Sequence, residues 1–206
     1  ELAFWIQDIK KHEVAVVRHF KRVVPLRHFV YEHTRGACTL AELKEFKARR
    51  DKEIEESDEL WEPEGPRYAT TTHIDLVDYL SKQHKLPCLY FVFSRRQCEE
   101  KAEELGRLVN YLTPAERNEV LTFFDDRIEG MNIGSMPSVK RMRKTLERGI
   151  AYHHAGLLPV LKEIVEDLFE RKIIRVLYAT ETFAVGINFP VRTVCFDSVR
   201  KFNGVD

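Results

Sequence analysis

Hydroxyl, carboxylate and amide side chains crowd the segment ATETFAVGINFP, residues 179–190, directly after the apolar run IRVLYA. That run predicts a buried strand, so the polar side chains would lie on a strand-to-helix turn. Ligands of an open parallel sheet bind beyond the carboxyl ends of its strands, where backbone N–H groups favour phosphate oxygens. Thr180 and Thr182 are therefore candidate phosphate ligands, and Gly186 would allow close backbone approach. The alternative is that Thr180 only caps a helix and Gly186 only serves a turn.

Polar residues also follow two other apolar runs. Ser94 and Arg95 come after CLYFVF, where Ser94 can cap the next helix. His153 and His154 end the run IAYHH. Because adjacent residues of a strand point to opposite faces, these histidines make a poor metal pair, and a structural role for them is an open alternative.

The groups that hydrolyse ATP are not recognisable in the sequence. Hydrolysis requires a Walker A lysine, a carboxylate that binds Mg²⁺ and an arginine finger. No glycine is followed by lysine, and the Asp58-Glu59 pair lies in a charge run without a strand before it. We therefore expect no catalytic residue in this chain and no activity from the chain alone.

The composition limits the kinds of surface that the chain can offer. Of 206 residues, 44% are hydrophobic, and 33 Lys and Arg balance 33 Asp and Glu. A net charge of zero argues against an extended basic surface, so any contact with nucleic acid must be local. No apolar run approaches the roughly 20 residues of a membrane helix, and no leader is visible, which predicts a cytoplasmic protein. Four cysteines without a CxxC pair predict reduced structural thiols.

Strand and helix patterns alternate from Pro87 onward, which predicts an α/β fold with a parallel sheet and helices on both faces. Helical periodicity follows Ser94 and Pro159, and two further helices form an insertion between strands. The expected strands are residues 88–93, 150–153, 174–179 and 193–196, and the insertion helices are residues 114–126 and 138–148.

Two charged segments have competing interpretations. The run from Glu42 to Glu59 mixes both signs at helical spacing, which fits a solvated helix or a contact arm for protein or RNA. A second, basic segment could form a local phosphate surface or a solvated helix face. It contains Lys140, Arg141, Arg143, Lys144 and Arg148.

Several segments together resemble a known family in order and spacing. Residues 91–105 look like helicase motif IV, and residues 148–197, with the specific element HHAGL, look like motifs IVa to V. ELAFWI and RVVPLRHFVYE, at residues 1–6 and 22–32, are similar to the approach to the second domain. The chain thus resembles the second RecA-like domain of a superkiller-type, exosome-associated DExH-box RNA helicase of superfamily 2.

The resemblance implies a RecA-like sheet with a charged helical insertion at about residues 34–72 in the N-terminal third. Residues 1–12 would be the tail of the first RecA-like domain, and residues 13–206 the second domain, cut before motif VI. The whole enzyme would use ATP and Mg²⁺ for 3′-to-5′ unwinding or remodelling in RNA processing or decay. The implied partners are single-stranded RNA, the first RecA-like domain in cis and RNA-decay machinery, and neither ATP nor Mg²⁺ is expected to be bound to the fragment.

Site residues follow from the matched motifs. Gly186 and Asn188 would contact the nucleotide, although many helicases have aspartate where Asn188 stands. The residues that would face nucleic acid are Ser94, Arg95, His154, Gly156, Thr180 and Thr182.

Two other functions fit the same residues. A DNA-repair helicase of this superfamily would make the same phosphate contacts, because only contacts to 2′-hydroxyls distinguish RNA from DNA. A non-catalytic interaction module could keep the fold and bind a protein through residues 42–59, since a fold alone does not establish a function.

Overall fold

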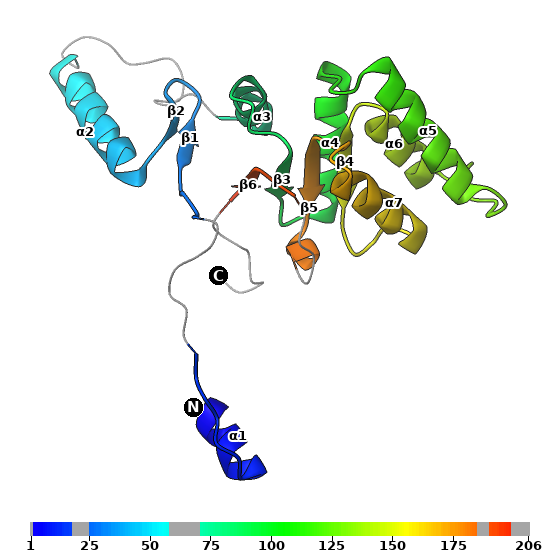
Figure 1. Ribbon diagram of the computed structural model, residues 1–206. Coiled ribbons are helices and arrows are strands. Elements are labelled where there is room, and N and C mark those ends of the chain that lie inside the picture. The colour runs from blue at the N-terminus through cyan, green and yellow to red at the C-terminus, as the bar shows by residue number, and fades with distance from the viewer. Residues whose placement is uncertain (1, 18–24, 58–70, 185–189, 199–206) are drawn as a thin grey trace. The chain divides into compact units, whose positions relative to one another are not determined.

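The computed structural model describes residues 2–17, 25–57, 71–184 and 190–198 (Figure 1). The chain forms two compact units, Glu1–Glu62 and Pro63–Asp206. The predicted domain boundary at residue 12 remains a prediction.

The described residues of the first unit form two helices and a small antiparallel hairpin. Its turn is closed by Glu32, whose carboxylate accepts the N–H groups of Thr34 and Arg35 at 3.0 and 3.1 Å. Glu42 and Thr39 bond reciprocally where the long charged helix begins. The charged run is helical through residue 57, and its last two residues, 58 and 59, lie outside the described residues. The elements are α1 (Leu2–Lys10), β1 (Val30–Glu32), β2 (Gly36–Cys38) and α2 (Leu40–Ser57).

The second unit contains a four-stranded sheet in the order β4-β5-β3-β6, in which every pair is parallel. Its strands are β3 (Cys88–Phe91), β4 (Ile150–His153), β5 (Val176–Ala179) and β6 (Thr193–Phe196). Its helices are α3 (His73–Lys82), α4 (Arg95–Leu108), α5 (Pro114–Ile128), α6 (Pro137–Leu146), α7 (Pro159–Glu170) and the short 3₁₀ helix η1 (Glu181–Ala184). The predicted fold class, α/β with a parallel sheet flanked by helices, is confirmed.

Local signals explain where the helices begin. The Ser94 hydroxyl accepts the N–H of Gln97 at 3.4 Å and caps α4 as predicted. Thr113 and Glu116 form a capping box for α5. Pro159 occupies the first turn of α7, where its missing N–H costs nothing. The strands are shorter than predicted: β3 ends at Phe91 rather than residue 93, and β5 begins at Val176 rather than residue 174.

The path of the chain sets which helix covers which face. From β3 it passes β5 to reach β4, and it then turns back to β5. With right-handed crossovers, α4 and α7 therefore lie on opposite faces. His154 contacts Glu99 of α4, whereas the neighbouring His153 contacts Glu166 of α7. This divergence is expected of adjacent residues at a strand end.

Strand β6 is less buried than the other three strands of the sheet. In the described part of the chain β6 pairs with β3 alone and forms an edge. Val194 is 45% exposed and Phe196 is 59% exposed there. The four cysteines are buried and free, as predicted. None of the described helices combines the length and apolarity that a membrane crossing would require.

The insertion predicted between strands is the α5–α6 helix pair. Its two ends meet, because the N–H of Tyr111 donates to the carbonyl of Arg148 at 3.0 Å. Gly149 then turns into β4 with φ of 75°, a value that suits glycine.

Candidate nucleic-acid interface

Three neighbouring strands end in the predicted contact residues. His154 and Gly156 follow β4, Thr180 follows β5, and Ser94 and Arg95 follow β3. Since the sheet is parallel and its order is β4-β5-β3, these carboxyl ends lie along one edge, with neighbouring strands about 5 Å apart. Thr180 is thus the central member of a row that the sequence had scattered over three motifs.

The turn after β5 has one buried aromatic side chain and two hydroxyl groups at the surface. Phe183 is only 3% exposed, and its N–H donates to the carbonyl of Thr180 at 3.0 Å. The hydroxyls of Thr180 and Thr182 lie 3.0 Å apart, with Thr180 half-buried and Thr182 exposed. The turn therefore holds two hydroxyls at the surface, as an oxyanion ligand would require.

The loop after β4 is organised by His154, which is 4% exposed. Its Nδ1 accepts the N–H of Gly156 at 3.1 Å, and its Nε2 lies 3.1 Å from Oε1 of Glu99. This arrangement fits a neutral ring with the proton on Nε2. Burial lowers the pKa of His154, although the hydrogen bond to Glu99 raises it. His154 therefore shapes the loop from inside instead of presenting its ring at the surface.

Gly156 lies close to both the histidine and motif IV. A Cβ built on it would lie 3.2 Å from Nδ1 of His154 and 3.7 Å from Cδ of Arg95. The exposed Arg95 stem thus runs beside the loop after β4. Ser94, in contrast, uses its hydroxyl to cap α4. The same oxygen atom would have to make the predicted contact to nucleic acid.

His153 supports the same edge from the other face. Its Nε2 lies 2.8 Å from Oε1 of Glu166, and its ring centroid lies 4.5 Å from that of Phe183. Burial lowers the pKa of His153. The two adjacent histidines reach different helices and do not converge on one point.

Gly186 and Asn188 lie in residues 185–189, outside the described residues. Their assignment to the nucleotide remains a prediction.

Sequence reasoning missed the residues that hold the motifs in place. Glu99 and Glu166 look like ordinary acidic positions on amphipathic helices, and their partners are distant in the sequence. Asp197, just after β6, accepts the Tyr90 hydroxyl at 3.1 Å and pairs with Lys101 at 3.0 Å. Only Phe183 gave a signal, as a large apolar residue in an otherwise polar turn.

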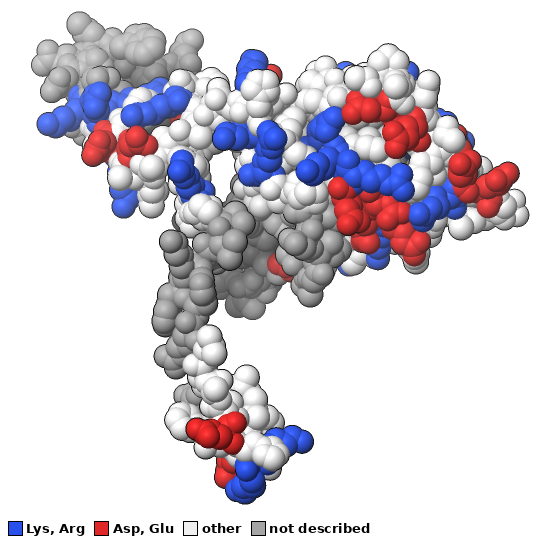
Figure 2. All heavy atoms as spheres, viewed as in Figure 1, with Lys and Arg blue, Asp and Glu red and all other residues white. Residues whose placement is uncertain are grey.

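The basic segment around α6 is partly neutralised. Arg143 makes two hydrogen bonds to Asp125, at 2.9 and 2.8 Å, and Arg141 pairs with Glu99 at 3.1 Å. Figure 2 shows Lys and Arg interleaved with Asp and Glu on the face of the second unit that it presents. The solvated-helix interpretation of this segment is therefore favoured over a phosphate surface.

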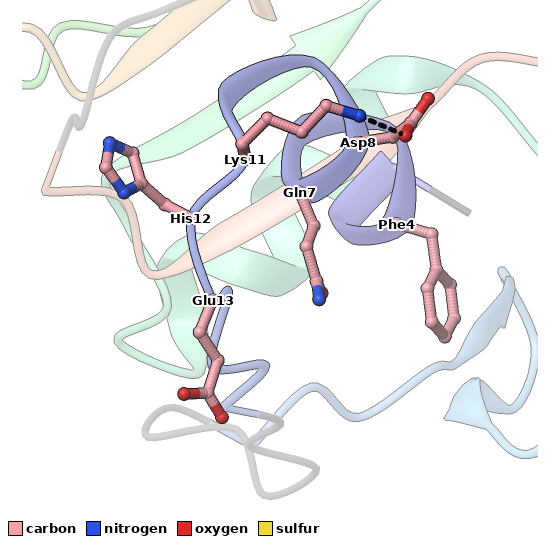
Figure 3. Close-up of a pocket in the computed structure, with 6 residues that line it drawn as sticks. All are labelled: Phe4, Gln7, Asp8, Lys11, His12 and Glu13. Atoms are coloured by element: carbon pink, nitrogen blue, oxygen red, sulfur yellow. Dashed lines mark hydrogen bonds and ion pairs between the residues drawn. The ribbon is translucent and has the colours of Figure 1, made fainter.

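Two surface hollows are lined by residues other than the predicted contact residues. The larger, about 630 Å³, is lined by exposed side chains of α1 and the residues after it, with one ion pair between Lys11 and Asp8 at 3.0 Å (Figure 3). The second, about 270 Å³, lies at the amino ends of the strands. Its two arginines are engaged: Arg192 donates to the carbonyl of His84 at 2.7 Å, and Arg175 pairs with Glu116 at 2.9 Å. Neither hollow competes with the carboxyl edge as a candidate site.

Known proteins match nearly the whole chain. Superkiller complex protein 2 of Homo sapiens is 34% identical over 227 residues, which cover 99% of this chain. Exosome RNA helicase MTR4 of Homo sapiens is 30% identical over 100% of the chain, and Antiviral helicase SKI2 of Saccharomyces cerevisiae is 43% identical over 68%. The chain belongs to the superkiller-type helicases of superfamily 2. No protein-family model matches it.

The match is to one part of each superkiller-type helicase. The chain spans 18% of the length of human Superkiller complex protein 2 and 21% of Exosome RNA helicase MTR4.

Proposed function

We propose that this chain is the second RecA-like half of an ATP-dependent RNA helicase and that the carboxyl edge of its sheet grips single-stranded RNA. The observation that carries the proposal is the strand order β4-β5-β3, which sets Thr180 between the loop of Gly156 and the start of α4. Three short motifs from distant parts of the sequence then form one row. A row of this kind suits a polymer with evenly spaced phosphates.

The chemistry of the row favours contacts to the sugar-phosphate backbone. Thr180 and Thr182 would donate hydroxyl protons to a phosphate, and Arg95 would supply a positive charge beside it. His154 would act indirectly by fixing the loop that carries Gly156. No base-reading residue is assigned, which suits a helicase that moves along any sequence.

ATP would bind between this half and a first RecA-like half in cis. Gly186 and Asn188 are the proposed nucleotide contacts, because an amide can hydrogen-bond a ribose hydroxyl. The described residues hold no group of three or more His, Cys, Asp or Glu side chains suited to a metal ion.

RNA is favoured over DNA because relatives across nearly the full chain carry RNA helicase in their names. On this basis the whole protein would unwind or remodel RNA in the 3′-to-5′ direction, in the cytoplasm and together with RNA-decay machinery. A DNA-repair helicase remains the alternative that the substrate assay below tests.

The test is binding of a fluorescent single-stranded RNA to the purified chain, followed by anisotropy at two salt concentrations. We expect weak binding that falls as salt rises, with a log-log slope of about −2 if three phosphates are contacted. The chain should show no ATPase activity.

Two controls sharpen this test. A DNA oligomer of the same sequence should bind more weakly, and Thr122→Val on an exposed face of α5 should leave binding unchanged. Failure to bind RNA at low salt would refute the proposal, and ATPase activity that survives Thr180→Val would refute the division of the enzyme into two halves. Stronger binding of DNA would favour the repair helicase.

A further inference from the structure

His153 lies beneath the phosphate-binding turn and contacts it in two ways. Its carbonyl accepts the N–H of Thr180 at 3.1 Å, and its ring packs on Phe183 at 4.5 Å between centroids. Phe183 in turn anchors the turn through its N–H bond to Thr180. The position of the two surface hydroxyls therefore depends on where the His153 ring lies.

The ring itself is fixed from the opposite side. Its Nε2 lies 2.8 Å from Oε1 of Glu166 on α7, and Phe169 of the same helix lies 6.5 Å from Phe183 between ring centroids. His153 is 7% exposed, so the ring has little room to shift. Helix α7, the ring and the turn thus form one packed stack.

The second ring nitrogen makes the stack sensitive to protonation. Nδ1 of His153 is buried and has no hydrogen-bond partner among the described residues. In the neutral ring with the proton on Nε2, Nδ1 is only an unused acceptor. In the charged ring it becomes a buried N–H donor without an acceptor, which is far more costly.

We propose that His153 is a positioning residue that holds the turn of Thr180 and Thr182 in its phosphate-gripping geometry while the ring is neutral, and loosens it when the ring is protonated. The proposal rests on the proposed function, because it concerns the same turn. It adds a role for a residue that touches no ligand.

The charges around His153 define the pH range. Burial is the largest influence and lowers its pKa, Glu166 of α7 raises it, and Lys162 of α7 and the adjacent His154 lower it further. The 3₁₀ helix contributes the uncharged Phe183 to this contact. The ring is therefore neutral at pH 7, and the loosening should occur below the ordinary histidine pKa of about 6.5.

The first test needs no RNA. Nuclear magnetic resonance of the chain between pH 7.5 and 4.5 would follow the His153 imidazole together with the backbone amides of Thr180, Thr182 and Phe183. We expect a neutral ring protonated on Nε2 at pH 7, and amide shifts that share its midpoint. In His153→Phe, which keeps a ring against Phe183, that midpoint should vanish from the amides.

A matched control separates positioning from general loss of a buried histidine. His73 is 6% exposed, and its Nε2 lies 3.1 Å from Glu104 of α4, so His73→Gln removes a buried imidazole of the same kind elsewhere. The shared midpoint should survive that change. If His153→Phe fails to fold, His153→Gln, which keeps a donor for Glu166, replaces it. The proposal would be overturned if the chemical shifts of the turn amides did not change with the titration of His153.

The second test joins the proposal to RNA. Between pH 7.5 and 5.5 the affinity of the wild-type chain for single-stranded RNA should fall about fivefold, the loss expected for one well-placed hydrogen bond. The fall should be markedly smaller in His153→Phe, where only His154 remains at this edge, and should persist in full in His73→Gln. If the turn amides titrate with His153 but the chain does not bind RNA, only the RNA function is refuted. If the chain binds RNA and His153→Phe loses as much affinity between pH 7.5 and 5.5 as the wild type, the positioning role is overturned.

Discussion

The backbone N–H of Thr180 donates a hydrogen bond to the carbonyl oxygen of His153 across 3.1 Å. This bond extends the β4–β5 ladder one residue beyond the end of β5. It fixes the motif after β5 to the motif after β4, so the two act as one unit. A substitution in either motif should therefore change the conformation of the other.

The hydroxyl of Thr180 should matter more than its shape. Thr180→Val keeps the size of the side chain and removes the hydroxyl, so RNA affinity should fall at least about tenfold, as for one lost hydrogen bond to a charged group. Thr180→Ser keeps the hydroxyl and should bind within about twofold of wild type. Anisotropy titrations at one salt concentration compare the three chains. Equal binding by the Val and Ser variants would contradict a role for the hydroxyl.

Glu99 should support the loop after β4 from a distance. It contacts His154 and Arg141, so Glu99→Gln weakens both contacts while keeping the side-chain volume. We expect a loss of about 1–2 kcal/mol in the free energy of unfolding, because His154 is buried. The neighbouring Glu100, exposed and paired with Arg96, provides the control: Glu100→Gln should cost less than about 0.5 kcal/mol. Urea titrations measure the free energy of unfolding of both variants. Equal losses would argue against a stabilising role for the contacts of Glu99 with His154 and Arg141.

Gly149 should resist substitution for two separable reasons. It has φ of 75°, and a Cβ there would lie 3.0 Å from Cδ2 of Leu112. Gly130 has a similar φ of 74° with nothing within 4 Å of its Cβ position. Gly130→Ala should therefore cost about 1 kcal/mol from backbone strain alone, and Gly149→Ala about 2–4 kcal/mol from strain plus overpacking. Chemical unfolding of both variants checks the difference, and similar losses would show that Leu112 moves aside.

The stability of the second unit should fall on mild acidification. Each of its three buried histidines has a folded-state pKa lowered chiefly by burial, so the unfolded chain binds their protons more readily. Their contribution is complete above about pH 6.5 and is lost as pH falls through the lower folded values. The urea midpoint should therefore drop between pH 7.5 and 5.5, and an unchanged or higher midpoint at pH 5.5 would contradict it. The three residues are His73, His153 and His154.

The positions of the strands along the chain could be predicted, because short apolar runs that alternate with amphipathic helical segments indicate a parallel α/β sheet. The residues at which β3 ends and β5 begins could not be predicted, because the pairing register between strands decides them. The exposure of β6 could not be predicted either, because it depends on which strand lies next to it. In the site, Thr180 and Thr182 were visible as hydroxyls after an apolar run. The acidic residues that support the site could not be predicted, because the partner of a residue such as Glu166 is known only after two distant segments pack together.

The bond between Tyr111 and Arg148 closes the α5–α6 pair at its base. A segment whose two ends already touch can grow, shrink or accept a foreign domain at its tip without spreading the strands that flank it. The exposed connection around Gly130 and Asn132 is thus a natural attachment point for a fluorescent reporter that leaves the carboxyl edge of the sheet undisturbed.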